Sequence, residues 1–190
     1  MTDADRLRGA FERVRRVDFL PPEQHGFAGE NAALPIGHGQ TNSQPSTVRD
    51  MLELLDVQPG HRVLDVGCGS GWTTALLGDL VGPAGEVVGV EVVPELTEWG
   101  RANLRRYDMA WTSIEQARAG VLGLPERAPY DRILVSAQAT TLPVELVSQL
   151  EVGGLMVVPV GGRMTVVRRT DGEPEISRAG WYTFVPLVEP

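Results

Sequence analysis

The fold of this chain is decided by the stretch Arg62-Val63-Leu64-Asp65-Val66-Gly67-Cys68-Gly69-Ser70-Gly71. Its first half is short, apolar and β-branched, which predicts a buried parallel strand. Three glycines then alternate with other residues, so the chain can turn tightly there and let a ligand approach its backbone. From Trp72 the apolar residues follow a helical spacing. A strand, a glycine turn and the start of a helix together indicate a nucleotide-cofactor site.

The details of this stretch favour one class of cofactor. A dinucleotide site has the pattern G-x-G-x-x-G, and its third glycine would fall at Trp72, whose indole obstructs close packing of helix and strand. Asp65 would also place a negative charge near a pyrophosphate. S-adenosylmethionine has no phosphate and carries a sulfonium and an ammonium group, so a carboxylate beside it is favourable. We therefore predict S-adenosylmethionine as the cofactor; the competing interpretation is a tight turn that binds no ligand.

The predicted cofactor contacts come from this stretch and from the next apolar run. The backbone groups expected to approach the cofactor belong to Gly67, Gly69, Ser70 and Gly71. Asp65 is expected either to order the loop or to face the methionine amine. Glu91 ends the run Val87-Val88-Gly89-Val90, where an acidic side chain can accept hydrogen bonds from both ribose hydroxyls. The pattern D-x-G-x-G-x-G followed by Glu91 resembles that of class I methyltransferases.

Charge and composition narrow the class of function. The chain has 25 acidic residues and 17 arginines, no lysine, and a net charge of −8. Nucleic-acid binding normally needs a basic face, so we expect no nucleic-acid partner. Several clustered arginines are expected to lie on solvated helix faces: Arg13, Arg15, Arg16, Arg105 and Arg106. The single cysteine, Cys68, excludes an intramolecular disulfide and a cysteine-based zinc cluster, and we expect no metal.

The termini and the apolar runs bear on location. The N-terminus, Met1-Thr2-Asp3-Ala4-Asp5, is acidic and lacks the apolar segment of a signal peptide. No apolar run approaches the length of a membrane span. We therefore expect a cytoplasmic protein that makes no membrane contact and acts as a monomer.

Helical and strand patterns alternate along the chain. Helices are predicted over 4–16, 46–56, from 72 onward, 94–106 and 143–150. Strands are predicted over 63–66, 87–90, 111–114, 132–136, 155–160, 164–168 and 181–185. This order predicts an α/β fold, a doubly wound, Rossmann-like sheet of seven mostly parallel strands with helices on both faces. We expect one domain over 1–190, in which residues 1–45 form an N-terminal helix and an irregular substrate or lid segment packed on the core.

A second motif precedes the glycine turn. Residues 34–45 read Leu-Pro-Ile-Gly-His-Gly-Gln-Thr-Asn-Ser-Gln-Pro. This motif resembles the signature of the protein-L-isoaspartate (D-aspartate) O-methyltransferases, usually L-P-I-G-x-G-Q-T-I-S-x-P. The resemblance extends over nearly the whole chain, through the glycine turn, Glu91, Ala128-Pro-Tyr-Asp-Arg-Ile and Gly153-Gly-Leu-Met-Val-Val-Pro-Val-Gly.

The resemblance implies an activity. The family transfers a methyl group from S-adenosylmethionine to the α-carboxylate of an L-isoaspartyl residue, and the ester then collapses to a succinimide whose hydrolysis restores some normal aspartate. A carboxylate with a pKa of about 4 is already ionised at neutral pH, so the reaction needs no general base. The expected task of the site is to align the carboxylate oxygen with the methyl carbon and the sulfur in a dry, enclosed space.

The resemblance also assigns roles to residues. Ser43 corresponds to the family serine of G-Q-T-I-S, and its hydroxyl is expected to hydrogen-bond the reacting carboxylate; the competing role is an N-cap for the helix that follows. Thr41 and Asn42 are expected beside the sulfonium. The segments expected to hold the isoaspartyl peptide are Gln40-Thr41 and Val160-Gly161.

Two departures from the family pattern bear on cofactor and substrate. Asn42 stands where the family has isoleucine. The family's Gly-Asp-Gly, whose aspartate bonds the adenine amino group, corresponds here to Arg118-Ala119-Gly120, so Ala119 cannot accept that bond. One lost hydrogen bond costs about 1 kcal/mol, a several-fold loss of affinity. Ala119 and Gly120 are still expected beside the adenine.

Three functions therefore remain open from the sequence. The first is an isoaspartyl repair methyltransferase that acts on damaged peptides and proteins. The second keeps the fold and cofactor but methylates an aspartate of one dedicated peptide or a small carboxylic acid. The third is a cofactor-binding interaction protein with little activity, against which the retained Ser43, Asp65 and Glu91 argue.

Overall fold

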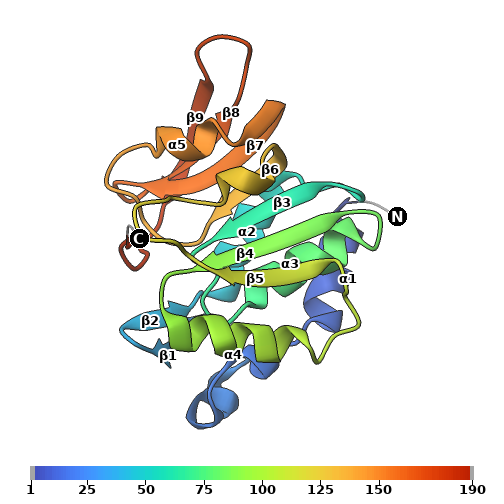
Figure 1. Ribbon diagram of the computed structural model, residues 1–190. Helices are drawn as coiled ribbons and strands as arrows, with labels where there is room; N and C mark the ends of the chain where they lie inside the picture. The colour runs from blue at the N-terminus through green and yellow to red at the C-terminus, as the bar shows by residue number, and fades with distance from the viewer. Residues whose placement is uncertain (1–2, 189–190) are drawn as a thin grey trace.

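The computed structural model of the chain describes residues 3–188 and contains one large mixed sheet. Its strands are β3 (Arg62–Val66), β4 (Glu86–Glu91), β5 (Thr112–Gln116), β6 (Tyr130–Val135), β7 (Leu150–Val160), β8 (Arg163–Arg168) and β9 (Glu175–Trp181). The spatial order is β5-β4-β3-β6-β7-β8-β9, as Figure 1 shows. The strands β3 to β7 pair in parallel, and β8 and β9 pair antiparallel. The predicted seven-stranded, mostly parallel sheet is confirmed.

Four helices cover one face of this sheet. They are α1 (Asp3–Arg13), α2 (Pro45–Leu55), α3 (Trp72–Val81) and α4 (Pro94–Leu104). Their buried side chains share one apolar cluster with Val63, Val87 and Leu134 of the central strands. Gly89 of β4 lies under α3, where an added Cβ would come within 2.8 Å of the Thr74 hydroxyl and 2.9 Å of the Cys68 sulfur. The close approach of α3 to the sheet therefore depends on the absence of a side chain at this position.

The opposite face is covered by short elements. Its core contains Leu64, Val88 and Ile133, the neighbours in sequence of the residues on the first face, as the alternation of side chains along a strand requires. The covering elements are α5 (Val144–Val147) and the 3-10 turn η3 (Pro125–Arg127) with their flanking loops. Helices thus lie on both faces, but the long ones lie on one. None of the helices within residues 3–188 is long and apolar enough to cross a membrane.

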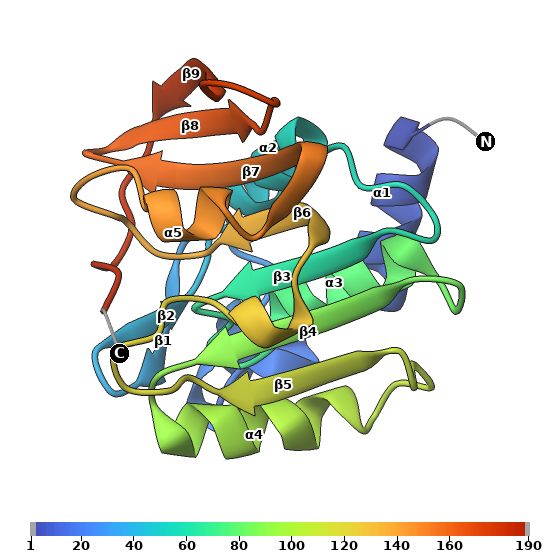
Figure 2. The same ribbon diagram turned by 45° about the horizontal axis from the view of Figure 1, so that its top comes forward.

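The segment before α2 has more structure than the sequence predicts. The predicted helix 4–16 ends at Arg13, and 3-10 turns follow at η1 (Arg16–Phe19) and η2 (Pro22–Phe27). The expected irregular stretch contains an antiparallel hairpin of β1 (Leu34–Gly37) and β2 (Gln40–Asn42). Its tight turn is possible because Gly37, His38 and Gly39 all have positive φ, at 87°, 53° and 71°. Figure 2 shows this hairpin beside the carboxyl ends of the parallel strands.

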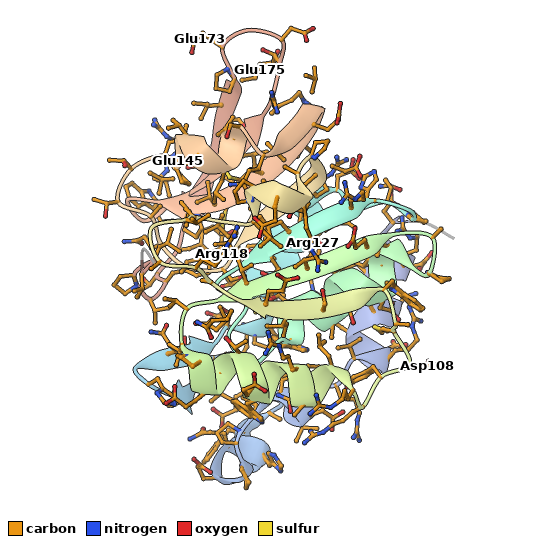
Figure 3. All side chains as sticks on the ribbon, in the orientation of Figure 1. Asp108, Arg118, Arg127, Glu145, Glu173 and Glu175 are labelled. Carbon is orange, nitrogen blue, oxygen red and sulfur yellow. The ribbon has the colours of Figure 1, made fainter. Side chains whose placement is uncertain are left out.

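The C-terminal elements differ most from prediction. The seventh strand is β9, Glu175–Trp181, and not 181–185 as predicted, because it pairs with β8 from Arg168↔Glu175 onward, in a hairpin whose loop is formed by residues 169–174. Figure 3 shows Glu173 and Glu175 near the outer end of this hairpin, away from the body of the sheet. The helix predicted over 143–150 has only four residues, 144–147. Gly153 and Gly154 lie inside β7, where the Gly153 N–H donates a hydrogen bond to the Arg169 carbonyl at 2.8 Å.

Candidate functional site

The glycine turn joins β3 to α3 as predicted. Gly67, Gly69 and Gly71 all have positive φ, at 73°, 54° and 88°, a region that favours glycine over any residue with a side chain. The N–H groups of Gly67 and Cys68 donate to the Val90 carbonyl at 2.9 and 3.2 Å, which fixes the turn against β4. The Cys68 thiol is buried under α3, and burial raises its pKa well above the usual value. Cys68 is therefore a packing residue and not a nucleophile.

Asp65 lies beneath this turn and is fully buried. Its Oδ2 accepts hydrogen bonds from the hydroxyls of Thr73 and Thr74 at 2.6 and 2.8 Å, and its Oδ1 accepts one from Ser136 at 3.0 Å. Burial raises the pKa of Asp65, and the three hydroxyl donors act in the opposite direction. Of the two roles expected for Asp65, this geometry matches the ordering of the loop, because Asp65 joins β3 to both α3 and β6.

Glu91 stands at the carboxyl end of β4 and is 5% exposed. Its Oε2 accepts a hydrogen bond from the Gly69 N–H at 2.8 Å, and its Oε1 accepts one from the Val93 N–H at 2.9 Å. Each carboxylate oxygen keeps a further acceptor site, since an ionised carboxylate has about four in all. The side chain thus orients the glycine turn while it lines the cleft beside it.

A cleft of about 620 Å³ lies at the carboxyl ends of the parallel strands. Its walls come from the ends of β3 and β4, the β1–β2 hairpin and residues 185–188. The described residues that line it include Glu91 but no arginine or histidine, so the cleft offers no cation for a phosphate. Apolar side chains such as Val66, Val90 and Leu122 form much of the remaining surface. These walls and the single carboxylate suit an adenosine that carries a cationic sulfonium.

The residues expected beside the adenine lie outside this cleft. Ala119 and Gly120 lie in an exposed turn closed by the bond from Val121 N–H to the Arg118 carbonyl at 3.0 Å, and neither lines the cleft. Leu122 and Gly123 line it instead. We find no contact of the Ala119 side chain with the cleft among the described residues.

Gln149 holds this part of the wall, and no sequence pattern predicts this role. Its amide donates to the Leu122 carbonyl at 2.8 Å and accepts from the Leu124 N–H at 2.9 Å. Gly123 between them has φ of 80° and lies so close to the Gln149 amide that an added Cβ would come within 2.6 Å of Oε1. Gln149 is separated from this loop by more than twenty residues, so no local pattern connects them.

The prediction that Arg16 is solvated is wrong. Arg16 is only 6% exposed, whereas Arg13 and Arg15 are exposed as predicted. The Arg16 Nε donates to Asn42 Oδ1 at 2.7 Å, and its terminal nitrogens donate to main-chain carbonyls along the segment before α2. These carbonyls belong to Ala28, Glu30, Ala32, Asn42 and Ser43. Burial lowers the pKa of Arg16 to about 10, which leaves it protonated at neutral pH.

Arg16 also connects this segment to the glycine turn. Its guanidinium lies 5.4 Å from the ring centroid of Trp72, the first residue of α3. Asn42 accepts from Arg16 and donates from Nδ2 to the Ser70 hydroxyl at 3.4 Å. Asn42 is 5% exposed and points into the protein, away from the cleft that it was expected to line. An isoleucine at this position could not accept the bond from Arg16, so the Asn42 amide has a structural role in this chain.

Ser43 lies in a second pocket, of about 650 Å³, that adjoins the first. Thr41, Ser136 and Val185 line both pockets and form their common boundary. The alternative role of Ser43 as an N-cap is not supported, because the residue before α2 is Gln44 and the helix has no side-chain cap. The Ser43 side chain is half-buried and available to a group in this pocket.

Of the remaining predicted residues, Ser70 and Gly71 are buried and line none of these three spaces, contrary to the expectation that their backbone approaches the cofactor. Gln40 lines the first cleft and not the Ser43 pocket. Gly161 lines a third space, a groove of about 1220 Å³ that continues from the Ser43 pocket. Val160 lines neither; its side chain packs against the core of the second sheet face. Within residues 3–188, no group of three His, Cys, Asp or Glu side chains could hold a metal ion.

The contacts of Arg16 generate a prediction. Arg16→Met should lower the free energy of unfolding by about 2–4 kcal/mol, because it leaves several buried carbonyl oxygens without donors. It should also make residues 28–43 susceptible to protease. Urea denaturation and limited proteolysis with mass spectrometry would measure both. The control is Arg15→Met, which removes only an exposed ion pair with Asp18 and should change stability by no more than about 0.5 kcal/mol. Equal behaviour of the two variants would contradict the role given to Arg16.

Comparisons with known proteins point to one family. Residues 1–190 match the family model of the protein-L-isoaspartate (D-aspartate) O-methyltransferases. A protein-L-isoaspartate O-methyltransferase of Aeropyrum pernix is 47% identical, with 96% of this chain covering 72% of the relative. One from Methanopyrus kandleri is 44% identical, with 97% of this chain covering 84% of the relative.

Solved structures show the same fold. A protein-L-isoaspartate O-methyltransferase with 26% identity superposes with a TM-score of 0.86 over 96% of this chain, which spans only 61% of that longer chain. A Plasmodium falciparum structure in complex with S-adenosyl-L-homocysteine has 23% identity and a TM-score of 0.87, and the match covers 100% of this chain and 93% of that one. The chain therefore belongs to the protein-L-isoaspartate (D-aspartate) O-methyltransferase family of class I, S-adenosylmethionine-dependent methyltransferases.

Proposed function

We propose that this chain methylates the α-carboxylate of L-isoaspartyl residues in peptides and proteins, and that Ser43 orients that carboxylate. The observation that carries the proposal is the shared boundary between the Ser43 pocket and the cofactor cleft, formed by Thr41, Ser136 and Val185. A carboxylate bound beside Ser43 would thus face a ligand that fills the cleft.

The reaction needs alignment and not proton transfer. The acceptor carboxylate is ionised at neutral pH, with a pKa of about 4, so no side chain has to remove a proton. S-adenosylmethionine, when bound, supplies the methyl group from a positively charged sulfur. Ser43 would donate a hydrogen bond to one carboxylate oxygen and leave the other oxygen free to attack. Positive and negative charge are neutralised in this step, so the apolar walls, Val66, Val90 and Val185, would favour it by limiting water.

The residues of the cleft support the cofactor roles. Glu91 has acceptor sites left for two ribose hydroxyls in addition to its bonds with Gly69 and Val93. The positive φ of Gly67 and Gly69 keeps side chains out of the space next to the β3 end. Asp65 contributes indirectly, through the hydroxyls that hold the loop in shape.

The alternative acceptors lose part of their support. In the sequence, Asn42 suggested a different substrate because a polar amide stands where the family has isoleucine. Its contacts with Arg16 and Ser70 account for the amide without any change of substrate. Ala119 stands where the family has an aspartate that bonds the adenine amino group. This departure concerns the affinity for the cofactor and not the identity of the acceptor.

The test uses two peptides that differ only in an isoaspartyl or an aspartyl linkage, with labelled S-adenosylmethionine. We expect base-labile label on the isoaspartyl peptide alone. Ser43→Ala should lower kcat by about a hundredfold, since misplacement of a reacting group by about 1 Å has effects of this size. The variant should bind S-adenosylhomocysteine as the parent does. The control is Ser177→Ala, an exposed position on β9, which should behave as the parent.

The outcomes separate the functions. Label on both peptides, or on neither, would refute the repair activity, and unchanged turnover in Ser43→Ala would refute the role of Ser43. If titration shows cofactor binding but no carboxylate is methylated, the interaction-protein hypothesis takes its place.

Glu91 gives a further prediction for the cofactor. Glu91→Gln should weaken S-adenosylhomocysteine binding by about ten- to a hundredfold, because bonds to a charged acceptor contribute about 1.5–3 kcal/mol and an amide also turns a donor toward the N–H groups of the loop. Isothermal titration calorimetry measures this change. Glu98→Gln, on the exposed side of α4, is the matched control and should leave the affinity unchanged. Equal affinities for the two variants would show that Glu91 does not contact the ligand.

A further inference from the structure

Trp181 is a large aromatic side chain left in solvent at the end of β9. It is 73% exposed, more than any other large apolar side chain among residues 3–188. The other exposed ones, such as Ile176 on the same strand, are aliphatic or only about half exposed, at 49% for Ile176. An isolated exposed tryptophan is costly to solvate, and tryptophan is enriched at binding surfaces because its ring offers a large rigid contact.

Trp181 lines the groove of about 1220 Å³ that continues from the Ser43 pocket. Four residues line both spaces, namely Gln44, Thr47, Thr183 and Phe184. The three spaces thus follow one another from the cofactor cleft, past Ser43, to Trp181. A chain whose modified carboxylate lies beside Ser43 would continue into this groove.

The ring of Trp181 is held in place on one side. The guanidinium carbon of Arg163 lies 4.8 Å from its ring centroid, and Arg163 is the β8 partner of Trp181. Gly162 has φ of 81°, and an added Cβ there would lie 3.5 Å from the ring. The ring therefore lies against the Gly162 backbone and the Arg163 guanidinium. It loses little conformational freedom when a ligand covers its solvent-exposed side.

The chain after Trp181 is also fixed. The Tyr182 N–H donates to the Gly162 carbonyl at 2.9 Å, and the Tyr182 hydroxyl donates to Asp50 Oδ2 of α2 at 2.8 Å. The bond to Asp50 raises the pKa of Tyr182, which stays a neutral donor at physiological pH. The groove wall therefore connects β9 with α2, the helix that begins two residues after Ser43.

The groove has the composition of a peptide site. Its polar lining consists of neutral amides and hydroxyls, among them Gln44 and Gln138. Asp50, its only carboxylate among the residues that the structure describes, already accepts a bond from Tyr182. Gly161 adds bare backbone that faces open space, since nothing lies within 4 Å of where its Cβ would be. Arg163 does not line the groove, so the ring of Trp181 and not the guanidinium would meet the occupant.

We infer that Trp181 forms a subsite for an aromatic or large aliphatic side chain that neighbours the isoaspartyl residue of the substrate. This inference rests on the proposed isoaspartyl activity and adds a preference for sequence context to it. Because Trp181 does not contact the reacting atoms, we expect it to stabilise the bound substrate and the transition state equally. Its effect therefore falls on KM and not on kcat.

The experiment compares isoaspartyl peptides that carry tyrosine, leucine, glycine or aspartate at the one to three positions on each side of the isoaspartate. With the parent protein, KM should be about five- to tenfold lower for tyrosine or leucine than for glycine at the preferred position. Trp181→Ala should remove this preference and leave kcat and S-adenosylhomocysteine affinity unchanged, while Trp181→Phe should keep most of it. Ile176→Ala is the matched control on the same strand and should keep all of it.

Each outcome either supports or overturns the Trp181 subsite. Equal KM values for the tyrosine, leucine and glycine peptides, or a preference that survives in Trp181→Ala, would overturn the subsite and leave the proposed function intact. A lower KM for the aspartate peptide would show that the occupant contacts the Arg163 guanidinium and not the Trp181 ring. This result would likewise overturn the subsite. Failure of the parent protein to methylate any of the isoaspartyl peptides would overturn the proposed function together with the subsite.

Discussion

The guanidinium of Arg16 is buried, and every hydrogen bond that it makes within the described residues goes to a carbonyl oxygen. A buried cation must find acceptors, and the planar, forked donors of arginine can serve several at once. The segment before α2 has only a small apolar cluster, in which Leu34 and Ile36 pack against Leu20 and Leu96. Arg16 therefore stabilises this segment through hydrogen bonds, whereas the sheet is stabilised by its hydrophobic core. Because the Ser43 carbonyl is one of the acceptors, the position of Ser43 depends on Arg16.

Two buried carboxylates shape the other side of the site. Asp65 gathers hydroxyls from α3 and β6 beneath the glycine turn, and Glu91 receives backbone N–H groups at its edge. Both sets of bonds are made between groups of the protein itself and hold the turn in one shape. A site held in this way reduces the entropy that cofactor binding must remove.

The site is assembled from distant parts of the chain. The hairpin β1–β2 and residues 185–188 both form walls of the cofactor cleft, although they lie near opposite ends of the sequence. The same C-terminal region continues through Phe184 and Thr183 to Trp181 along the acceptor side. One continuous surface thus includes the glycine turn, the helix that follows Ser43 and the last strand. The order of strands in the sheet brings these three together at its carboxyl edge.

The sequence by itself determined the elements whose signals are local. The short apolar runs of β3 and β4, the alternating glycines after β3 and the motif around Ser43 were enough for the sheet, the cofactor turn and the family. Tertiary structure alone decided the burial of Arg16, the inward orientation of Asn42, the part of the cleft wall held by Gln149 and the position of Trp181. An arginine beside exposed arginines has no pattern that marks it as buried. Its state depends on Asn42 and Trp72, which are 26 and 56 positions away and come into contact only when the chain folds.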